Sequence, residues 1–157
     1  MDLFFRTARP AEGADAERIL RAAFTPYLRR LGREIPPGYY DAWLPASIDD
    51  GDVYAADTGG VLVGVATTQR KESGLYLRHL AVDPTLQRSG AGRFLLTRLA
   101  EVGRARGDKA MTLETAEMMD HLIRLYRSDG FEIVRRGPPD HGLDPHLRVF
   151  MEKKLTP

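Results

Sequence analysis

The amino-acid sequence predicts a single mixed α/β (α+β) domain that spans residues 1–157. The first observation is size, because 157 residues with 43% hydrophobic side chains can form one compact core but not two large ones. The second is that runs typical of β-strands alternate along the chain with stretches of helical periodicity. The third is a continuous apolar run, Leu75 to Val82, which leads into a glycine-rich turn and then a helical stretch.

The first part of the chain predicts one strand and two helices. Leu3 to Thr7 is a short apolar run that predicts the first strand. From Asp15 to Leu31 apolar residues recur at helical spacing, with Asp15 as the expected cap and Pro26 expected to kink or end the helix. Tyr39 to Leu44 predicts a short second helix.

The middle of the chain predicts a hairpin followed by a buried strand. The runs Asp52 to Asp57 and Val61 to Gln69 flank a Gly-Gly turn, which is the pattern of a β-hairpin. The run Leu75 to Val82 is apolar on both faces, which is typical of a central strand that is covered on both sides.

The last third predicts a helix, a strand, a second helix and two closing strands. Each range follows from its apolar spacing and from the glycine that ends each helix. In chain order these are a helix that follows Gly92 and runs to about Arg106, a strand over Ala110 to Thr115, a helix over Met118 to Ser128, and strands over Phe131 to Arg136 and Arg148 to Leu155.

Composition narrows the function classes. The absence of cysteine excludes a disulfide framework, thiolate-bound metals and an acyl-enzyme on a thiolate. With 23 basic against 22 acidic residues, the net charge of +1 argues against a dedicated nucleic-acid binder. No apolar run is long enough to cross a membrane, so we expect a soluble, cytoplasmic protein. His141 and His146 are not spaced like a metal site on one element, so we expect no bound metal.

The segment Gln87 to Gly92 lies between the predicted central strand and a predicted helix. Free backbone N–H groups and the positive end of a helix dipole meet at such a place, and together they bind phosphate. Gly90 and Gly92 let the backbone approach an anion, while Arg88 and Arg93 can add charge-assisted hydrogen bonds. A strand-to-helix turn that simply needs glycine is the alternative interpretation.

Two common phosphate-binding motifs do not fit this segment. A Walker A loop ends in Gly-Lys-Ser/Thr, whereas Gly92 is followed by Arg93 and Phe94. A Rossmann fingerprint would need a glycine at position 95, which is Leu95.

Two motifs instead resemble those of the GNAT superfamily of acetyltransferases. Its cofactor signature, Gln/Arg-x-x-Gly-x-Gly/Ala, is similar to the six residues from Gln87 to Gly92, with Arg88 as an alternative leading residue. Leu80 to Pro84 resembles the family's usual lead-in, and Leu125 to Phe131 resembles its later Leu-Tyr-x-x-x-Gly-Phe motif. The resemblance runs over essentially the whole chain and implies a mixed, mostly antiparallel central sheet of about six to seven strands, flanked by about four helices.

The resemblance also implies acetyl-CoA as the acyl donor, with its pyrophosphate held by the glycine turn. The backbone of Leu80 and Val82 would pair with the pantetheine arm as if it were another strand. The cofactor-binding residues implied in this way are Leu80, Ala81, Val82, Gln87, Arg88, Ser89, Gly90, Ala91, Gly92 and Arg93.

The implied reaction is transfer of the acetyl group to a primary amine, by direct transfer in a ternary complex. Glu114, near the end of its strand, is the leading candidate for the base, and Tyr126 is expected to give a proton to the leaving thiolate. Glu114 could instead be a solvated carboxylate, and Tyr126 a packed aromatic residue. His79 is a further candidate base, although a lone histidine in an apolar strand is more often packed and hydrogen-bonded. A backbone N–H near Leu80 to Val82 would meet the oxyanion.

One position departs from the family pattern. Many relatives carry Asn seven residues before the motif tyrosine, where it contacts the cofactor. Here that position is Met119, with Asp120 beside it, so the sequence does not predict this side-chain contact.

The acceptor is left open as a small-molecule or peptide amine. We expect it to bind near the aromatic segment Tyr27 to Trp43 and the loop Gly137 to Pro145. Homodimers are common in the family, so the resemblance leaves a homodimer open. A non-catalytic acyl-CoA-binding sensor or regulatory module on the same fold is the alternative function, and the presence of both Glu114 and Tyr126 favours the enzyme.

Overall fold

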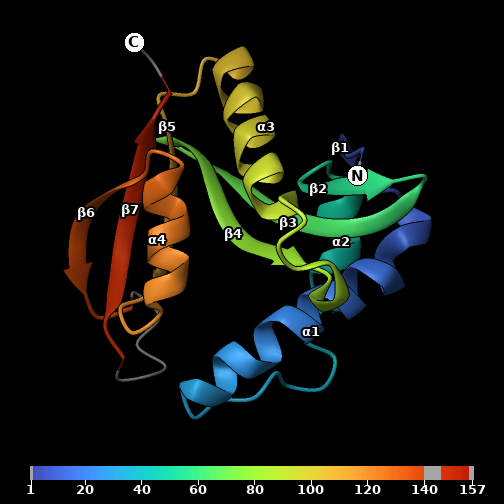
Figure 1. Ribbon diagram of the computed structural model, residues 1–157, viewed down its shortest axis with the longest axis horizontal. Helices are drawn as coiled ribbons and strands as arrows, with labels where there is room; N and C mark the ends of the chain where they lie inside the picture. Colours follow the sequence, from blue (N-terminus) through green and yellow to red (C-terminus); the bar gives the residue numbers. More distant parts are fainter. Residues whose placement is uncertain (1, 140–145, 156–157) are drawn as a thin grey trace. The chain divides into compact units, whose positions relative to one another are not determined.

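A computed structural model describes residues 2–139 and 146–155 of the chain (Figure 1). These residues group into two compact units. The first takes in the chain up to Thr68 and the stretch His79–Leu95, and the second takes in Gln69–Arg78 and the chain from Leu96 onward. Three long elements have residues in both units: β3 (Val61–Lys71), β4 (Gly74–Val82) and α3 (Ala91–Arg106). Because the described residues group into two units, the single domain over residues 1–157 stays a prediction.

Seven strands of the described residues form one sheet in the order β1-β2-β3-β4-β5-β7-β6, and four α-helices accompany it. The pairings β1–β2, β2–β3, β5–β7 and β6–β7 are antiparallel, while β4–β5 is parallel. The mixed, mostly antiparallel sheet is therefore confirmed. The remaining elements are β1 (Phe4–Thr7), α1 (Gly13–Arg30), α2 (Leu44–Asp49), β2 (Val53–Thr58), β5 (Ala110–Ala116), α4 (Asp120–Ser128), β6 (Glu132–Gly137) and β7 (Arg148–Lys154), with short 3-10 turns η1 (Pro10–Glu12) and η2 (Pro84–Leu86).

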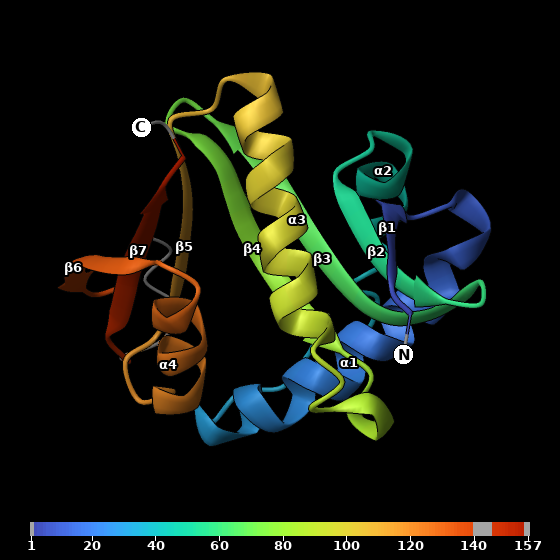
Figure 2. The ribbon, with the colours of Figure 1, turned by 45° about the horizontal axis from the view of Figure 1, so that its top comes forward.

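The predicted hairpin in the first unit is present. β2 and β3 pair from Val53↔Thr67 to Thr58↔Val61, with an irregularity after Ala56. Both turn glycines adopt positive φ, 60° at Gly59 and 85° at Gly60, which explains why this turn requires glycine. In the same unit, α2 lies beside β1 and β2 (Figure 2).

The core of the first unit joins the two helices to the sheet. Apolar side chains of α1 and α2 pack against inward-facing residues of β2, β3 and the end of β4. The buried members are Ala8, Ala16, Ile19, Leu20, Tyr40, Leu44, Ile48, Val53, Ala55, Leu62, Val65 and Ala81.

The helix predicted over Asp15 to Leu31 is present as α1, which contains Pro26 and ends at Arg30, so Pro26 does not end it. Two boundary predictions in this unit are wrong. The helix begins at Gly13 rather than at Asp15, because the η1 turn leads directly into it and Glu12 takes the cap position. Tyr39 to Leu44 forms turns and not a helix, and α2 begins only at Leu44, followed by Pro45 in its first turn.

In the second unit, β7 pairs with β5 on one side and with β6 on the other. Figure 1 shows α4 beside β6 and β7. Lys153 of β7 donates to Asp129, at the end of α4, over 3.1 Å. The helix predicted to begin at Met118 begins at Asp120.

In the described part of the chain, no helix combines the length and the apolar character that a membrane crossing requires.

Candidate functional site

The glycine turn has the geometry of an anion site. After η2 the chain turns through Gln87 to Gly90, and α3 begins at Ala91. Gly90 has φ +84°, and a Cβ built there would meet no heavy atom within 4 Å, so the backbone faces open space. The first turn of a helix leaves backbone N–H groups without intrahelical partners, and the helix dipole adds positive potential. This turn can therefore accept a phosphate.

The side chains around the turn add charge and order. Arg88 and Arg93 are both exposed, and Arg88 has the one positive φ, 69°, among the described non-glycine residues. Ser89 accepts a hydrogen bond from the backbone N–H of Ala91 over 3.3 Å. Gln87 donates from Nε2 to the carbonyl oxygen of Val82 at 3.4 Å, which links the turn back to the end of β4.

The strand before the turn has a backbone edge available. The ladder between β4 and β5 runs from Gly74↔Ala110 to Tyr76↔Thr112 in the described residues. Leu80, Ala81 and Val82 lie beyond that ladder, so among the described residues no β5 residue pairs with them. An extended ligand arm can pair with such an edge.

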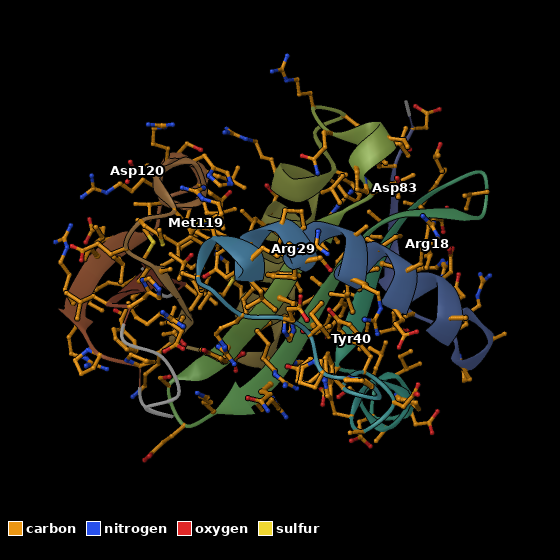
Figure 3. The ribbon with its side chains drawn as sticks, turned by 90° about the horizontal axis from the view of Figure 1, so that it is seen from below. Arg18, Arg29, Tyr40, Asp83, Met119 and Asp120 are labelled. Carbon is orange, nitrogen blue, oxygen red and sulfur yellow. The ribbon has the colours of Figure 1, made fainter. Side chains whose placement is uncertain are left out.

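Asp83 organises the connection between β4 and the turn. Its Oδ1 accepts hydrogen bonds from the backbone N–H of Thr85 at 3.0 Å and from the Thr85 hydroxyl at 2.8 Å. Its Oδ2 accepts from Arg18 of α1 at 3.2 Å (Figure 3). The Thr85 backbone hydrogen bond is the main reason that the pKa of Asp83 lies below its ordinary value, and Arg18 lowers it further. The cap could be predicted from the sequence, because Asp-Pro-Thr is a recognisable capping pattern. The contact with Arg18 could not, because Arg18 lies far from Asp83 in sequence.

His79 is packed rather than isolated. Its Nδ1 lies 2.7 Å from the Thr67 hydroxyl oxygen. Its ring stacks on Trp43 with centroids 5.2 Å apart and an 11° interplanar angle, and it meets Phe24 edge-on at 5.2 Å. Phe24 in turn meets Tyr27 edge-on at 5.9 Å, so Tyr27 and Trp43, from the aromatic segment near which the acceptor is expected, both belong to the group of rings around this histidine.

Tyr126 and Glu114 belong to the second unit, whereas the glycine turn belongs to the first. Tyr126 is 7% exposed on α4, and its ring meets Phe131 at 5.8 Å. Glu114 is half-buried on β5, between the buried Leu113 and Thr115, as the predicted alternation requires. The packed ring and the half-buried carboxylate are compatible with catalytic roles, which stay predictions.

At the position where many relatives carry Asn, Met119 is buried and precedes α4, and its backbone N–H donates to Ala116. Asp120 is exposed in the first turn of α4 (Figure 3). A buried thioether cannot replace the hydrogen bonds of an amide side chain.

A cavity of about 340 Å³ in the second unit is lined by Glu117, Met118, His146 and Leu147. His146 accepts a hydrogen bond at its carbonyl oxygen from Arg148 over 3.0 Å. His141 and most of the predicted acceptor loop lie outside the described residues. Within residues 2–139 and 146–155, no three His, Asp or Glu side chains gather in a way that could hold a metal ion.

Comparison with known proteins decides the family. The model of the Acetyltransferase (GNAT) family matches residues 15–131. The chain belongs to the GNAT family. The match includes both the glycine turn and the Leu-Tyr motif, so the family resemblance read from the sequence is confirmed.

One relative is similar to this chain in sequence. "IAA acetyltransferase" of Azospirillum brasilense is 38% identical over 103 residues, which cover 64% of this chain and 65% of that protein. The match thus spans slightly less than two thirds of the relative.

Solved structures show the GNAT fold. The PaiA N-acetyltransferase of Thermoplasma acidophilum, in complex with coenzyme A, matches with a TM-score of 0.76 and 16% identity over 98% of this chain and 99% of that chain. YncA of Salmonella typhimurium, solved with its cofactor acetyl-CoA, matches with a TM-score of 0.75 and 23% identity over 98% and 94% of the two chains.

Proposed function

We propose that the protein is an N-acetyltransferase that moves the acetyl group of acetyl-CoA to a primary amine of a small molecule or peptide. The glycine turn carries the proposal. Open space at Gly90, the N-terminus of α3 and two exposed arginines form a place for a pyrophosphate. Membership of the GNAT family and the neighbours solved with acetyl-CoA and coenzyme A support this choice of donor.

The residues present fit a coenzyme A donor in two respects. The backbone at residues 88–93 offers N–H groups without a Cβ in the way at Gly90. The edge of Leu80 to Val82 offers a strand partner for the pantetheine arm, which contains amide groups. Together these contacts would hold the donor by its phosphates and its amides, independently of the acceptor.

Direct transfer needs three contributions from the chain, two proton transfers and one hydrogen bond to the oxyanion. The amine must lose a proton before its lone pair attacks the thioester carbonyl carbon, and we assign this proton to Glu114. The developing oxyanion meets a backbone N–H near Leu80 to Val82. When the C–S bond breaks, the Tyr126 hydroxyl gives its proton to the sulfur.

The first experiment measures donor binding and turnover together. Titration calorimetry with acetyl-CoA should show one site, and thiol release should follow with at least one of spermidine, lysine amide, phenethylamine and an alanyl peptide. Tyr126→Phe should lower kcat by about 10²-fold, because it removes the proton donor but keeps the ring. Tyr54→Phe is the matched control, since Tyr54 is also buried and stacks on Phe5, and its turnover should match that of the wild type.

Acetyl-CoA binding without turnover on any amine would contradict the proposed N-acetyltransferase activity and favour a non-catalytic acyl-CoA sensor. An equal loss of kcat in Tyr126→Phe and Tyr54→Phe would contradict the proposed role of Tyr126 as proton donor, but not the acetyltransferase activity. Glu114→Gln should raise the pH at which turnover begins, with exposed Glu101→Gln as its control.

A further inference from the structure

A cavity of about 340 Å³ lies where the β5–β7 ladder ends. Its lining residues come in two consecutive pairs, one directly after β5 and one directly before β7: Glu117, Met118, His146 and Leu147. The backbone N–H of Glu117 donates to the carbonyl oxygen of Leu147 over 2.9 Å, which extends the ladder by one hydrogen bond. The two sides of the cavity are therefore held by a pair of hydrogen-bonded strands.

Two of the lining side chains are apolar and exposed. Of the five large apolar side chains that are exposed in the described residues, Met118 and Leu147 both line this cavity, with exposed fractions of 39% and 47%. Covering such surface is favourable, and pockets for small molecules are mostly apolar, with volumes of about 300–1,000 Å³. The cavity is thus suited to the apolar part of a small ligand.

The acidic side chain of the cavity already has a cation beside it. Glu117 is the one carboxylate among the four lining residues, and its Oε1 lies 3.3 Å from Nε of Arg136 on β6. A ligand cation placed here would compete with Arg136 for the same carboxylate, and an ion pair at such an exposed position contributes little. The cavity therefore favours an uncharged apolar group over an ammonium group.

Glu114, which we propose as the base, lies on the strand that leads to this cavity. It precedes Glu117 by three residues, and both belong to the second unit. A strand rises about 3.3 Å per residue, so the cavity begins about 10 Å along the chain from Glu114. An amine beside Glu114 reaches the cavity only through a carbon skeleton of several bonds, whereas ethylamine is too short.

We propose that this cavity binds the apolar end of the acceptor, so that the preferred acceptors are primary monoamines with an aliphatic or aromatic group several carbons from the nitrogen. The inference rests on the proposed function, because it takes Glu114 as the place where the amine reacts. Contacts far from the reacting atoms are equally strong in the ground state and in the transition state, so Met118 and Leu147 should act on KM more than on kcat.

A series of linear alkylamines tests this substrate class. Burying one more CH₂ group strengthens binding about fourfold. From butylamine to octylamine, KM should therefore fall about fourfold at most with each added carbon, while kcat changes little. Spermidine has a chain of similar length but carries further ammonium groups, so its KM should be much higher than that of octylamine. A KM that does not depend on chain length, or a lower KM for spermidine than for octylamine, would overturn the inference.

Variants of the two apolar side chains test where the contact is made. Leu147→Asn and Met118→Gln make the cavity polar at similar side-chain volume, and either should raise the ratio of the octylamine KM to the ethylamine KM about tenfold. Val134→Asn is the matched control, since Val134 is 59% exposed on β6 and does not line the cavity. A ratio unchanged in Leu147→Asn and Met118→Gln would place the apolar contact elsewhere and overturn the inference.

Methionine methyl resonances test the cavity without turnover. Among the methionines of the described residues Met118 is exposed, whereas Met111, Met119 and Met151 are buried. In the full-length protein with coenzyme A present, millimolar octylamine should shift the Met118 signal, which is assigned by its loss in Met118→Gln. The signals of Met111 and Met151 should stay in place, and spermidine should leave all of them unchanged. A Met118 signal that octylamine does not move would contradict the inference.

The failure of this inference can be told from the failure of the proposed function. If no amine is acetylated but octylamine shifts the Met118 signal, the proposed function is wrong and the cavity keeps its ligand class. Acetylation of amines without any dependence of KM on chain length contradicts only the inference. A Met118 signal that moves with protein concentration alone would identify a second copy of the chain as the occupant, and would also overturn it.

Discussion

Arg18 on α1 and Asp83 at the end of β4 are joined by a 3.2 Å hydrogen bond across 65 residues of sequence. Arg18 also donates to Asp15 in its own helix, and Asp83 also caps the η2 turn through Thr85. The first helix is thereby tied to the segment that leads into the glycine turn. Because Arg18 is half exposed, we expect the Thr85 contacts to contribute more of the stability than the ion pair.

Replacing Asp83 should loosen this connection. Asp83→Ala removes both Thr85 hydrogen bonds and the Arg18 pair, so the free energy of unfolding should fall by about 1–2 kcal/mol. Asp83→Asn keeps one acceptor oxygen and should lose less. Denaturant unfolding measures both, with exposed Asp49→Ala as the control. A cost for Asp83→Ala no larger than the control would contradict the capping role.

The Asp83 contribution should depend on pH in one direction. Its folded-state pKa is lowered, chiefly by the Thr85 backbone hydrogen bond, so the ionised carboxylate stabilises the fold. This stabilisation is fully present above the ordinary carboxyl pKa of about 3.9 and is lost as the pH falls through the lowered value. The difference in unfolding free energy between wild type and Asp83→Asn should stay constant from pH 7 to about pH 5 and shrink below about pH 4. A difference that grows on acidification has the wrong sign.

Arg6 holds two poorly exposed carboxylates, those of Glu12 and Asp57. It donates to both Glu12 oxygens at 2.7 and 2.8 Å and to Asp57 at 2.6 Å, and the exposed fractions of the three side chains are 18%, 15% and 8%. The Arg6 hydrogen bond is the main reason that the pKa of Glu12 is lowered.

Arg6→Met should therefore cost about 3 kcal/mol of unfolding free energy, because it leaves both carboxylates without their cation. The Arg6→Met/Glu12→Gln pair should cost less than the sum of the single changes. Arg98→Met is the control, since Arg98 pairs with Glu101 on an exposed helix surface and should cost less than about 1 kcal/mol. Strict additivity of the Arg6 and Glu12 changes would show that the two side chains act independently.

The strands could be predicted from the sequence because their evidence is local. Alternation and the Gly-Gly turn locate β2 and β3, and the alternation around Glu114 matches the observed burial on β5. Pro26 does not end α1, because tertiary packing overrides a local rule. Pro26 removes one backbone N–H, but buried residues such as Leu20 and Leu31 on either side of it anchor the helix and its end.

The partners of functional side chains could not be predicted in this way. His79 meets Trp43 and Thr67 only because β3, β4 and the segment before α2 converge in the folded unit. No periodicity of the sequence predicts which ring nitrogen of His79 lies against the Thr67 hydroxyl. The glycine turn, by contrast, could be found because its signal lies within six consecutive residues.

Gly90→Ala tests the glycine turn against a position of the same local geometry. Gly90 and Gly107 have φ of 84° and 79°, and a Cβ at either would meet no heavy atom within 4 Å, so alanine should cost about 1 kcal/mol of stability at both. Only at Gly90 would the new methyl group occupy the space assigned to a phosphate, and there we expect acetyl-CoA affinity to fall at least about tenfold, equivalent to about 1.4 kcal/mol. Titration calorimetry and denaturant unfolding of the two variants separate the effects. Equal affinities in the two variants would mean that glycine at position 90 serves the turn alone, since the strain is shared and only the ligand contact differs.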